Sequence, residues 1–309
     1  MLISSIFIAI TITLMYSAPL ALAAMGGVIS ERAGVVNIGI EGMMSIGALT
    51  GVVVAYFTQN PWLGLLCAGL AGGGIALLHA VASITFMADQ TVSGIAINLV
   101  GSGLALFFAR YFFSGATTTP PVPFKLPKII NQKYLDGTIF SSLNIDVTVV
   151  IAALVVFLTW FFMSKTKWGF RVKALGEHPA AVDTLGVSVY KLRYVCVILS
   201  GILAGVGGGT VTLAIISQFS PIAISGQGFI ALAAVIFGKW KPIGAYLACL
   251  LFGFSQALFV IFGGGNSVLI PPTILAMLPY VLTILILILF VGRSAAPKSS
   301  GQPYQKGER

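Results

Sequence analysis

The residues best suited to chemistry lie in one short stretch, ISERAGVVNIGIEGMMSIGAL, whose other positions are mostly apolar or glycine. It contains Glu31, Arg32, Asn37 and Glu41. Residues four apart share a helix face, so a helix that begins near Gly34 would present Asn37 and Glu41 together. A carboxylate inside a bilayer costs roughly 2.5–3.5 kcal/mol on insertion scales. Glu41 is therefore expected to contact a polar partner or water.

Two interpretations of Glu41 are open on the sequence alone. In one, Asn37 and Glu41 line a polar path for a substrate across the membrane. In the other, Glu41 caps or pins a broken helix, and neighbouring glycines supply the backbone freedom. An isolated amide in a membrane helix is more often a hydrogen-bonding contact between helices. Further candidates for the path are therefore weaker: Asn98, Gln218, Gln227, Gln256 and Asn266.

The sequence lacks the motifs that bind nucleotides or metals. The nearest approach to a nucleotide-binding loop is AAVIFGKW at residues 233–240, which lacks the first glycine and the Ser or Thr that holds magnesium. His79 is isolated in an apolar stretch, without a second ligand at metal-binding spacing. We predict that this chain is not an enzyme and holds no metal or other cofactor. Any ATP hydrolysis then belongs to another chain.

The composition requires lipid as the main solvent, because 58% of the residues are apolar and only 8% are charged. A soluble domain carries about 25% charged residues. Apolar stretches able to cross a bilayer occur at about 3–25, 34–57, 62–87, 92–114, 145–163, 194–216, 227–238, 242–262 and 272–291. We predict an all-α polytopic membrane protein with about 8–10 transmembrane helices, including broken or half-helices. Residues 1–292 form a single transmembrane domain in this prediction.

The basic residues predict how the chain is oriented. Most of the 17 Lys and Arg residues fall on one side of the predicted membrane, and the positive-inside rule assigns that side to the cytoplasm. We therefore expect a multi-pass protein of the plasma (inner) membrane, with its amino terminus outside and its carboxyl terminus in the cytoplasm. The net charge of +9 then reflects topology, and nucleic acid is not expected as a partner.

Three polar segments lie outside the predicted spans. Residues 115–144 form an outside loop whose prolines disfavour a helix, and this loop either meets a delivery protein or closes the outer mouth. Residues 164–193 form a basic cytoplasmic loop that we interpret as containing one short helix. Residues 293–309, rich in Pro, Ser and Gly, are expected to form a disordered basic cytoplasmic tail.

Glycine recurs at a spacing of four in several predicted spans, as in Gly201, Gly205 and Gly209 and in GLAGG at residues 69–73. Lipid provides no hydrophobic drive between helices, so small residues promote association by letting backbones approach. We interpret these glycines as sites of tight helix packing. A helix contact that moves is the alternative.

Four segments of the sequence carry a resemblance to a known family: ERAGVVNIGIEGMM, DQTVSGIAINLVGSGLA, GEHPAAVDTLGVSVYKLRY and SGQGFIALAAVIFGKWKPIGAYLACLLFGF. They resemble the permease subunit of the nucleoside/simple-sugar ABC importer family, which is allied to the ribose-type and branched-chain amino-acid ABC permeases. The resemblance covers about residues 16–291, in order and with similar spacing. The versions NIGIEG and GFIALAAVIFGKW resemble the shorter of two paired permeases.

The resemblance implies partners as well as a fold. It implies a second homologous permease subunit, a cytoplasmic ABC ATPase that binds ATP and magnesium, and an extracytoplasmic substrate-binding lipoprotein, all around a core in contact with membrane lipid. It also implies a coupling helix that sits on the ATPase, where an ordinary solvated surface helix is the alternative. In this sequence the coupling positions are Gly176, Glu177, His178, Pro179, Ala180, Ala181, Asp183 and Gly186.

Together these observations predict a membrane-spanning permease subunit of an ATP-driven ABC importer, most simply for nucleosides, that works by alternating access. Asn37, Glu41, Asn98 and Gln227 are the candidate residues of the substrate path or of a helix break. An ABC permease for a sugar or a branched-chain amino acid is the nearest alternative. An ion-coupled secondary transporter, with Glu41 as the protonatable group, is an alternative from another class. A membrane scaffold that transports nothing is a third.

Overall fold

A computed structural model describes residues 2–130, 144–263, 277–278, 281, 284–285 and 296–306. Within this part the chain is almost entirely helical, and seven helices are long and apolar enough to cross a bilayer. The prediction of an all-α polytopic membrane protein is confirmed. The predicted span at 272–291 lies almost wholly outside the described residues.

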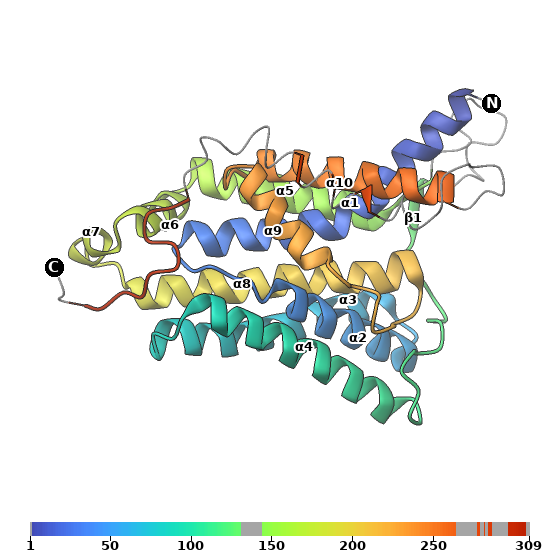
Figure 1. Ribbon diagram of the computed structural model, residues 1–309, viewed down its shortest axis with the longest axis horizontal. Helices are drawn as coiled ribbons and strands as arrows, with labels where there is room; N and C mark the ends of the chain where they lie inside the picture. The colour runs from blue at the N-terminus through green and yellow to red at the C-terminus, as the bar shows by residue number, and fades with distance from the viewer. Residues whose placement is uncertain are drawn as a thin grey trace.

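The long helices run side by side along the molecule (Figure 1), with α4 on one face and α5 and α10 on the opposite face. The helices are α1 (Leu2–Arg32), α2 (Ile40–Thr58), α3 (Pro61–Ala80), α4 (Gln90–Phe112), α5 (Val147–Lys165), α6 (Lys167–Glu177), α7 (Pro179–Thr184), α8 (Val189–Thr210), α9 (Gln227–Phe237) and α10 (Pro242–Gly263). Two π-helical turns, η1 (Val81–Thr85) and η3 (Val211–Ile216), continue α3 and α8.

Two helices need comparison with the spans predicted for them, α2 for where it begins and α9 for its length. The predicted span at 34–57 begins only at Ile40 as α2, because residues 34–39 leave the helical path. The 11 residues of α9 reach only about 16 Å at 1.5 Å per residue, about half of a bilayer core. The predicted span at 227–238 is therefore a half-helix, of the kind that we expected without knowing which segment would form it.

The basic loop at 164–193 contains two helices, α6 and α7, and not the single short helix that we predicted. The break falls at His178, whose backbone is not helical, and Pro179 occupies the first turn of α7. Proline fits there because that position needs no amide hydrogen bond. Both helices lie at the end of the molecule opposite the amino terminus (Figure 1).

The described part of the loop at 115–144 runs without a helix along the end of η3. Thr119 N donates to Phe219 O at 3.0 Å, and Val122 N donates to Ser217 O at 2.7 Å. Strands β1 (Lys128–Ile130) and β2 (Ile145–Asp146) then pair antiparallel. These contacts agree with a loop that covers one end of the helix bundle; residues 131–143 lie outside the described part.

Glycines bring α8 into backbone contact with its neighbours. A Cβ atom added to Gly72 on α3 would lie 2.8 Å from the Cα atom of Gly205 on α8, and one added to Gly47 on α2 would lie 2.5 Å from the same atom. Real Cβ atoms do not approach this closely. The interpretation of the glycine spacing as tight helix packing is confirmed for the contact of α8 with α2 and α3.

The packing predicts different costs for two substitutions on one helix. Gly72→Val should lower the thermal unfolding midpoint and the yield of folded protein, because its side chain meets the backbone of α8. Gly74→Val, two residues away, is the control, since a Cβ atom there meets nothing within 4 Å. Size-exclusion chromatography of heated, detergent-solubilised protein measures both. Equal midpoints for the two variants would contradict the packing.

Candidate functional site

A break in the helical path separates α1 from α2 at residues 33–39, where Gly34 has a φ of +84° that favours glycine. Backbone groups freed inside a bilayer must find partners within the protein. Side chains of other helices provide them: Gln90 Oε1 accepts from Val36 N at 2.8 Å. His79 Nε2 donates to Val36 O at 3.0 Å, so this isolated histidine supports the break.

Asn98 supports the same break from α4. Its Oδ1 atom accepts from Gly42 N at 2.9 Å, and its Nδ2 atom donates to Ile38 O at 3.0 Å. In a continuous helix Gly42 N would bond to Ile38 O, and the amide of Asn98 pairs both of these groups instead. The structure therefore places Asn98 at the helix break, and Asn98 is not among the residues that line the cavity beside α9 described below.

Asn37 lies inside the break, before α2 begins, and does not share a helix face with Glu41 as we expected. The reason is that a residue off the helical path no longer obeys helical spacing. Asn37 Nδ2 donates to Ser200 Oγ of α8 at 2.9 Å, and its Oδ1 atom is buried without a partner among the described residues. Asn37 therefore ties the break to α8.

Glu41 joins the first turn of α2 to the start of the half-helix α9. Its two carboxylate oxygens accept hydrogen bonds from Gly226 N and Gly228 N, each at 2.6 Å. These amides are among those that a helix N-terminus leaves without intrahelical partners, and a negative charge there is favoured by the helix dipole. The interpretation in which Glu41 caps a broken helix is the one that the geometry supports.

Glycine is needed at both positions that Glu41 contacts. Gly226 has a φ of +83°, a conformation that costs other residues energy. A Cβ atom on Gly228 would lie 2.5 Å from Glu41 N, so only glycine lets α9 approach α2 this closely. Gln227 lies between these two glycines, so the bonds of Gly226 and Gly228 to Glu41 fix its backbone on both sides.

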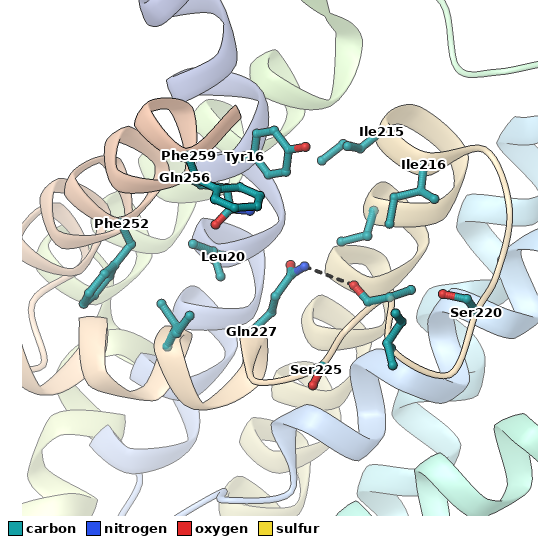
Figure 2. Close-up of a pocket in the computed structure, with 14 residues that line it drawn as sticks. Tyr16, Leu20, Ile215, Ile216, Ser220, Ser225, Gln227, Phe252, Gln256 and Phe259 are labelled. Carbon is teal, nitrogen blue, oxygen red and sulfur yellow. Dashed lines mark hydrogen bonds between the residues drawn. The ribbon is translucent and has the colours of Figure 1, made fainter. Parts of the chain in front are cut away.

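Gln227 points into a cavity of about 480 Å³ between α1, η3, α9 and α10 (Figure 2). Its Nε2 atom donates to Ala223 O at 3.1 Å, which orients the amide within the cavity. The opposite side is formed by α1 and α10, with Tyr16, Gln256 and Phe259. Of the four path candidates, the structure thus places Gln227 on the cavity and the other three at the helix break or at its junction with α9.

Sequence reasoning missed most of the cavity lining. Tyr16 and Phe259 are aromatic residues within apolar runs, where nothing distinguishes them from lipid-facing rings. Ser220 and Ser225 belong to the segment between η3 and α9, which we included in no predicted span. Gln256 was found, as one of the weaker path candidates, because it is a polar residue inside a predicted membrane span.

The end of α1 is fastened to the turn between α9 and α10. Arg32 Nε donates to Trp240 O at 2.9 Å, and Arg32 Nη2 donates to Lys239 O at 3.3 Å. The Trp240 indole N–H donates to the Glu31 carboxylate. Burial, together with the nearby charge of Arg32, lowers the pKa of Lys173 on α6. A cluster of cations therefore gathers where α1, α6 and this turn meet.

The coupling positions divide into a buried anchor and an exposed tip. Gly176 at the end of α6 is buried against the backbone of α1, and Glu177 is half-buried beside it. The tip, α7 and the residues around it, exposes small or apolar side chains. Exposed tip residues are His178, Ala180, Ala181, Leu185 and Gly186, while Pro179 and Asp183 are half-buried. Figure 1 shows α7 projecting from the end of the bundle.

Residues 296–306 of the tail follow a defined course over the α6–α8 region, which differs from the disorder that composition predicts for 293–309. Ser299 Oγ donates to Gly176 O at 2.9 Å, and Arg193 Nη1 donates to Gln302 O at 3.1 Å. Tyr190 Oη donates to Tyr304 O at 3.1 Å. Composition cannot reveal these contacts, because their partners lie far away in the sequence.

Comparisons with known proteins agree with this architecture. The family described as the permease component of branched-chain amino acid transport systems matches residues 9–290. The chain is 48% identical over 312 residues to the guanosine ABC transporter permease protein NupQ of Bacillus subtilis (strain 168). This similarity covers 96% of this chain and 96% of NupQ. It is 41% identical over 305 residues to the nucleoside ABC transporter permease protein NupC of Lactococcus lactis subsp. cremoris, again covering 96% of each.

A third relative has a different printed substrate. The putative glucose ABC transporter permease protein TsgC13 of Haloferax volcanii is 37% identical over 242 residues, covering 77% of this chain and 73% of the relative. Similarity to sugar permeases is therefore present, over a shorter part of the chain.

The bonds of Glu41 predict a graded response to substitution. Glu41→Gln keeps one acceptor oxygen for two amides, and Glu41→Leu keeps none, so thermal midpoints should fall in the order wild type, Gln, Leu. Each unpaired buried amide costs about 1–3 kcal/mol. Ser45→Ala is the control, because Ser45 Oγ bonds only to Glu41 O in its own helix. A Leu variant as stable as wild type would contradict the cap.

The tail contacts predict a difference in proteolysis. Ser299→Val removes the hydroxyl that bonds to the carbonyls of Leu175 and Gly176, so the tail should detach more often and trypsin should cleave after Lys298 several-fold faster. The neighbouring variant Ser300→Val is the control, at a half-buried position. Mass spectrometry of timed digests measures the rates. Equal rates for wild type and Ser299→Val would show that these bonds do not hold the tail.

Proposed function

The chain belongs to the family of permease components of branched-chain amino acid transport systems, and from this premise we propose that it is the membrane-spanning permease subunit of an ATP-driven ABC importer for nucleosides. The proposal of nucleosides as the substrate class rests on sequence identity to two permeases named for guanosine and nucleoside transport. The identities are 48% and 41%, each over 96% of the chain. The relative named for glucose is less similar and covers less of the chain.

In the proposed mechanism the cavity at Gln227 lies on the substrate path, and α9 is the element that opens or closes it. Glu41 fixes one end of α9 against α2, and Arg32 fixes the other end through the carbonyl of Trp240. A shift of α1 relative to α2 therefore turns α9 and changes the shape of the cavity. Such a change between two packed arrangements is what alternating access requires.

We propose that the mechanical input arrives at α7 from a partner ATPase. The buried end of α6 contacts the backbone of Arg32 through Gly176, and Arg32 bonds to the turn that ends α9. A force on α7 would thus reach the half-helix α9 through α6 and the side chain of Arg32. The tail adds stiffness to this connection, because Ser299 bonds to Gly176 and lies beside Gly34 in the helix break.

The orientation follows from charge. The end of the molecule that carries α7 and the tail also carries Arg32, Lys173 and Lys239, near the cation cluster described above. The positive-inside rule favours the cytoplasm for that end of a plasma-membrane protein. The amino terminus, at the opposite end (Figure 1), then lies outside.

The proposed partners follow from the two ends. An ATPase that binds ATP and magnesium would hold the small exposed residues Ala180 and Ala181, and the side chain of Leu185, which is 81% exposed, in a surface groove. A second permease would pack along the membrane-facing helices. A substrate-binding lipoprotein would dock at the outer end, over the loop that begins at residue 115.

The alternative of an ion-coupled transporter has less support in the geometry. Both oxygens of Glu41 accept backbone amide hydrogens, and a proton on either oxygen would replace an acceptor by a donor. Glu41 is also not among the described residues that line the cavity. A proton carrier needs to exchange its proton with the path, and Glu41 is arranged for a structural bond.

The coupling proposal predicts an uncoupled complex. Ala181→Trp should leave the protein inserted in the membrane, while nucleoside-stimulated ATP hydrolysis and nucleoside uptake fall several-fold, because a large ring at the exposed tip keeps α7 from its groove. Ala116→Trp, the same change at an exposed position in the loop that begins at 115, is the control. Both rates are measured on the assembled complex in proteoliposomes with labelled nucleosides, sugars and amino acids.

The same assay separates the two parts of the proposal. Normal coupling in Ala181→Trp would show that α7 is not the transmission point. Uptake of a sugar or a branched-chain amino acid with no uptake of any nucleoside would overturn the substrate class and leave the permease assignment in place.

A further inference from the structure

The cavity at Gln227 combines two carboxamides, two half-buried aromatic rings and two serine hydroxyls around one space (Figure 2). We propose that this cavity is a transient binding station for the base of an uncharged nucleoside, held between rings and read by the two amides. This rests on the proposed function, and goes further by assigning the ligand class to named residues of this chain.

The aromatic residues border one side of the cavity. Tyr16 comes from α1 and Phe259 from α10, and both side chains are half-buried and line the space. Nucleobases stack on such rings whatever their sequence identity, because every base has a π-face. Phe252 lies deeper, is 1% exposed and packs against Phe237 with 5.9 Å between ring centroids. It closes the wall and leaves stacking to Tyr16 and Phe259.

The two amides can read a base edge. Gln227 uses one N–H to reach Ala223 O at 3.1 Å, which leaves its Oε1 atom and its second N–H for a ligand. Gln256 is half-buried on the facing helix α10 and lines the same cavity. A carboxamide offers a donor and an acceptor side by side, the pattern that pairs with the edges of nucleobases. Two such groups on opposite walls suit a planar heterocycle with polar edges.

The absence of charge narrows the ligand class. Among the described lining residues there is no Asp, Glu, Lys, Arg or His. An amino acid would bring a buried ammonium and carboxylate, and a nucleotide would bring phosphate, and each would lack a counter-charge here. A nucleoside is neutral, and the hydroxyls of Ser220 and Ser225 provide polar partners for its sugar. The cavity of about 480 Å³ lies within the range of small-molecule sites.

The station has a built-in release step. Gln227 is held by backbone bonds of its neighbours Gly226 and Gly228 to Glu41, whereas Tyr16 and Phe259 belong to other helices. Any turn of α9 therefore moves one reading amide away from the stacking rings. Binding is strongest in one arrangement and weak in the other, as a transported ligand requires.

The test measures binding and transport separately on the purified complex of this chain with its partners in nanodiscs. Saturation-transfer NMR with guanosine, adenosine and uridine, without the binding protein, reports whether base protons contact the complex. Wild type should show base signals, and Phe259→Leu and Gln256→Leu should weaken binding about tenfold, the size expected for loss of a stacking or paired contact. Uptake at nucleoside concentrations below saturation should fall with binding.

Two controls are matched to these variants. Phe254→Leu makes the same change on α10 at a ring that is 46% exposed and does not line the cavity. Gln59→Leu removes an exposed amide that bonds to Tyr56 O. Both should bind like wild type. Tyr16→Phe should also retain stacking, whereas Tyr16→Leu should not.

The outcomes distinguish this inference from the proposed function. If the complex imports nucleosides but the Phe259, Gln256 and Tyr16→Leu variants bind and transport like wild type, the cavity is not the station. If the variants and their controls weaken binding equally, the effect is general destabilisation and the station is overturned. If wild type imports only sugars or amino acids, the proposed function fails first, and the absence of base signals confirms that failure.

Discussion

The structure depends on one constraint, which is that a broken helix inside a bilayer must have its freed backbone groups paired within the protein. The described part of this chain breaks its helical path before α2 and before α9, and side chains from other elements pair the freed groups at each break. Glu41 stands at the first turn of α2 and pairs the free amides of α9. Asn98 and His79 pair the groups between α1 and α2. These contacts fix the positions of the break between α1 and α2 and of the start of α9.

This constraint also explains why polar residues at the break and polar residues at the cavity have different tasks. Glu41 and Asn98 use both polar atoms of their side chains in bonds to the chain itself, and Asn37 donates to Ser200. Gln227 keeps half of its amide free because its neighbours, Gly226 and Gly228, carry the bonds to Glu41. The carboxylate thus positions a cavity-facing group without lining the cavity itself. A polar residue in a membrane span is therefore a weak guide to the path unless its partners are known.

The sequence could predict what depends on local pattern. Hydropathy identified the membrane class and the apolar segment at 227–238, and glycine spacing identified the packing of α8. The combination of Glu41 with glycines allowed a helix break but could not choose it over a path lining, because the partners Gly226 and Gly228 lie 185 and 187 residues away. The same distance problem hid Ser200 as the partner of Asn37. For the tail, composition predicted disorder because single-residue averages ignore bonds such as that of Ser299 to Gly176.

The role of Glu41 bears on where the energy for transport comes from. Both carboxylate oxygens of Glu41 accept backbone amide hydrogens, and this pairing holds α9 to α2. In the proposed mechanism the pairing is kept throughout the cycle, so the work of moving α9 enters by another route. The exposed tip of α7, joined through Gly176 and Arg32 to the far end of α9, would provide that route. A chain built in this way is suited to being driven by a partner, and this favours an ATPase over an ion gradient.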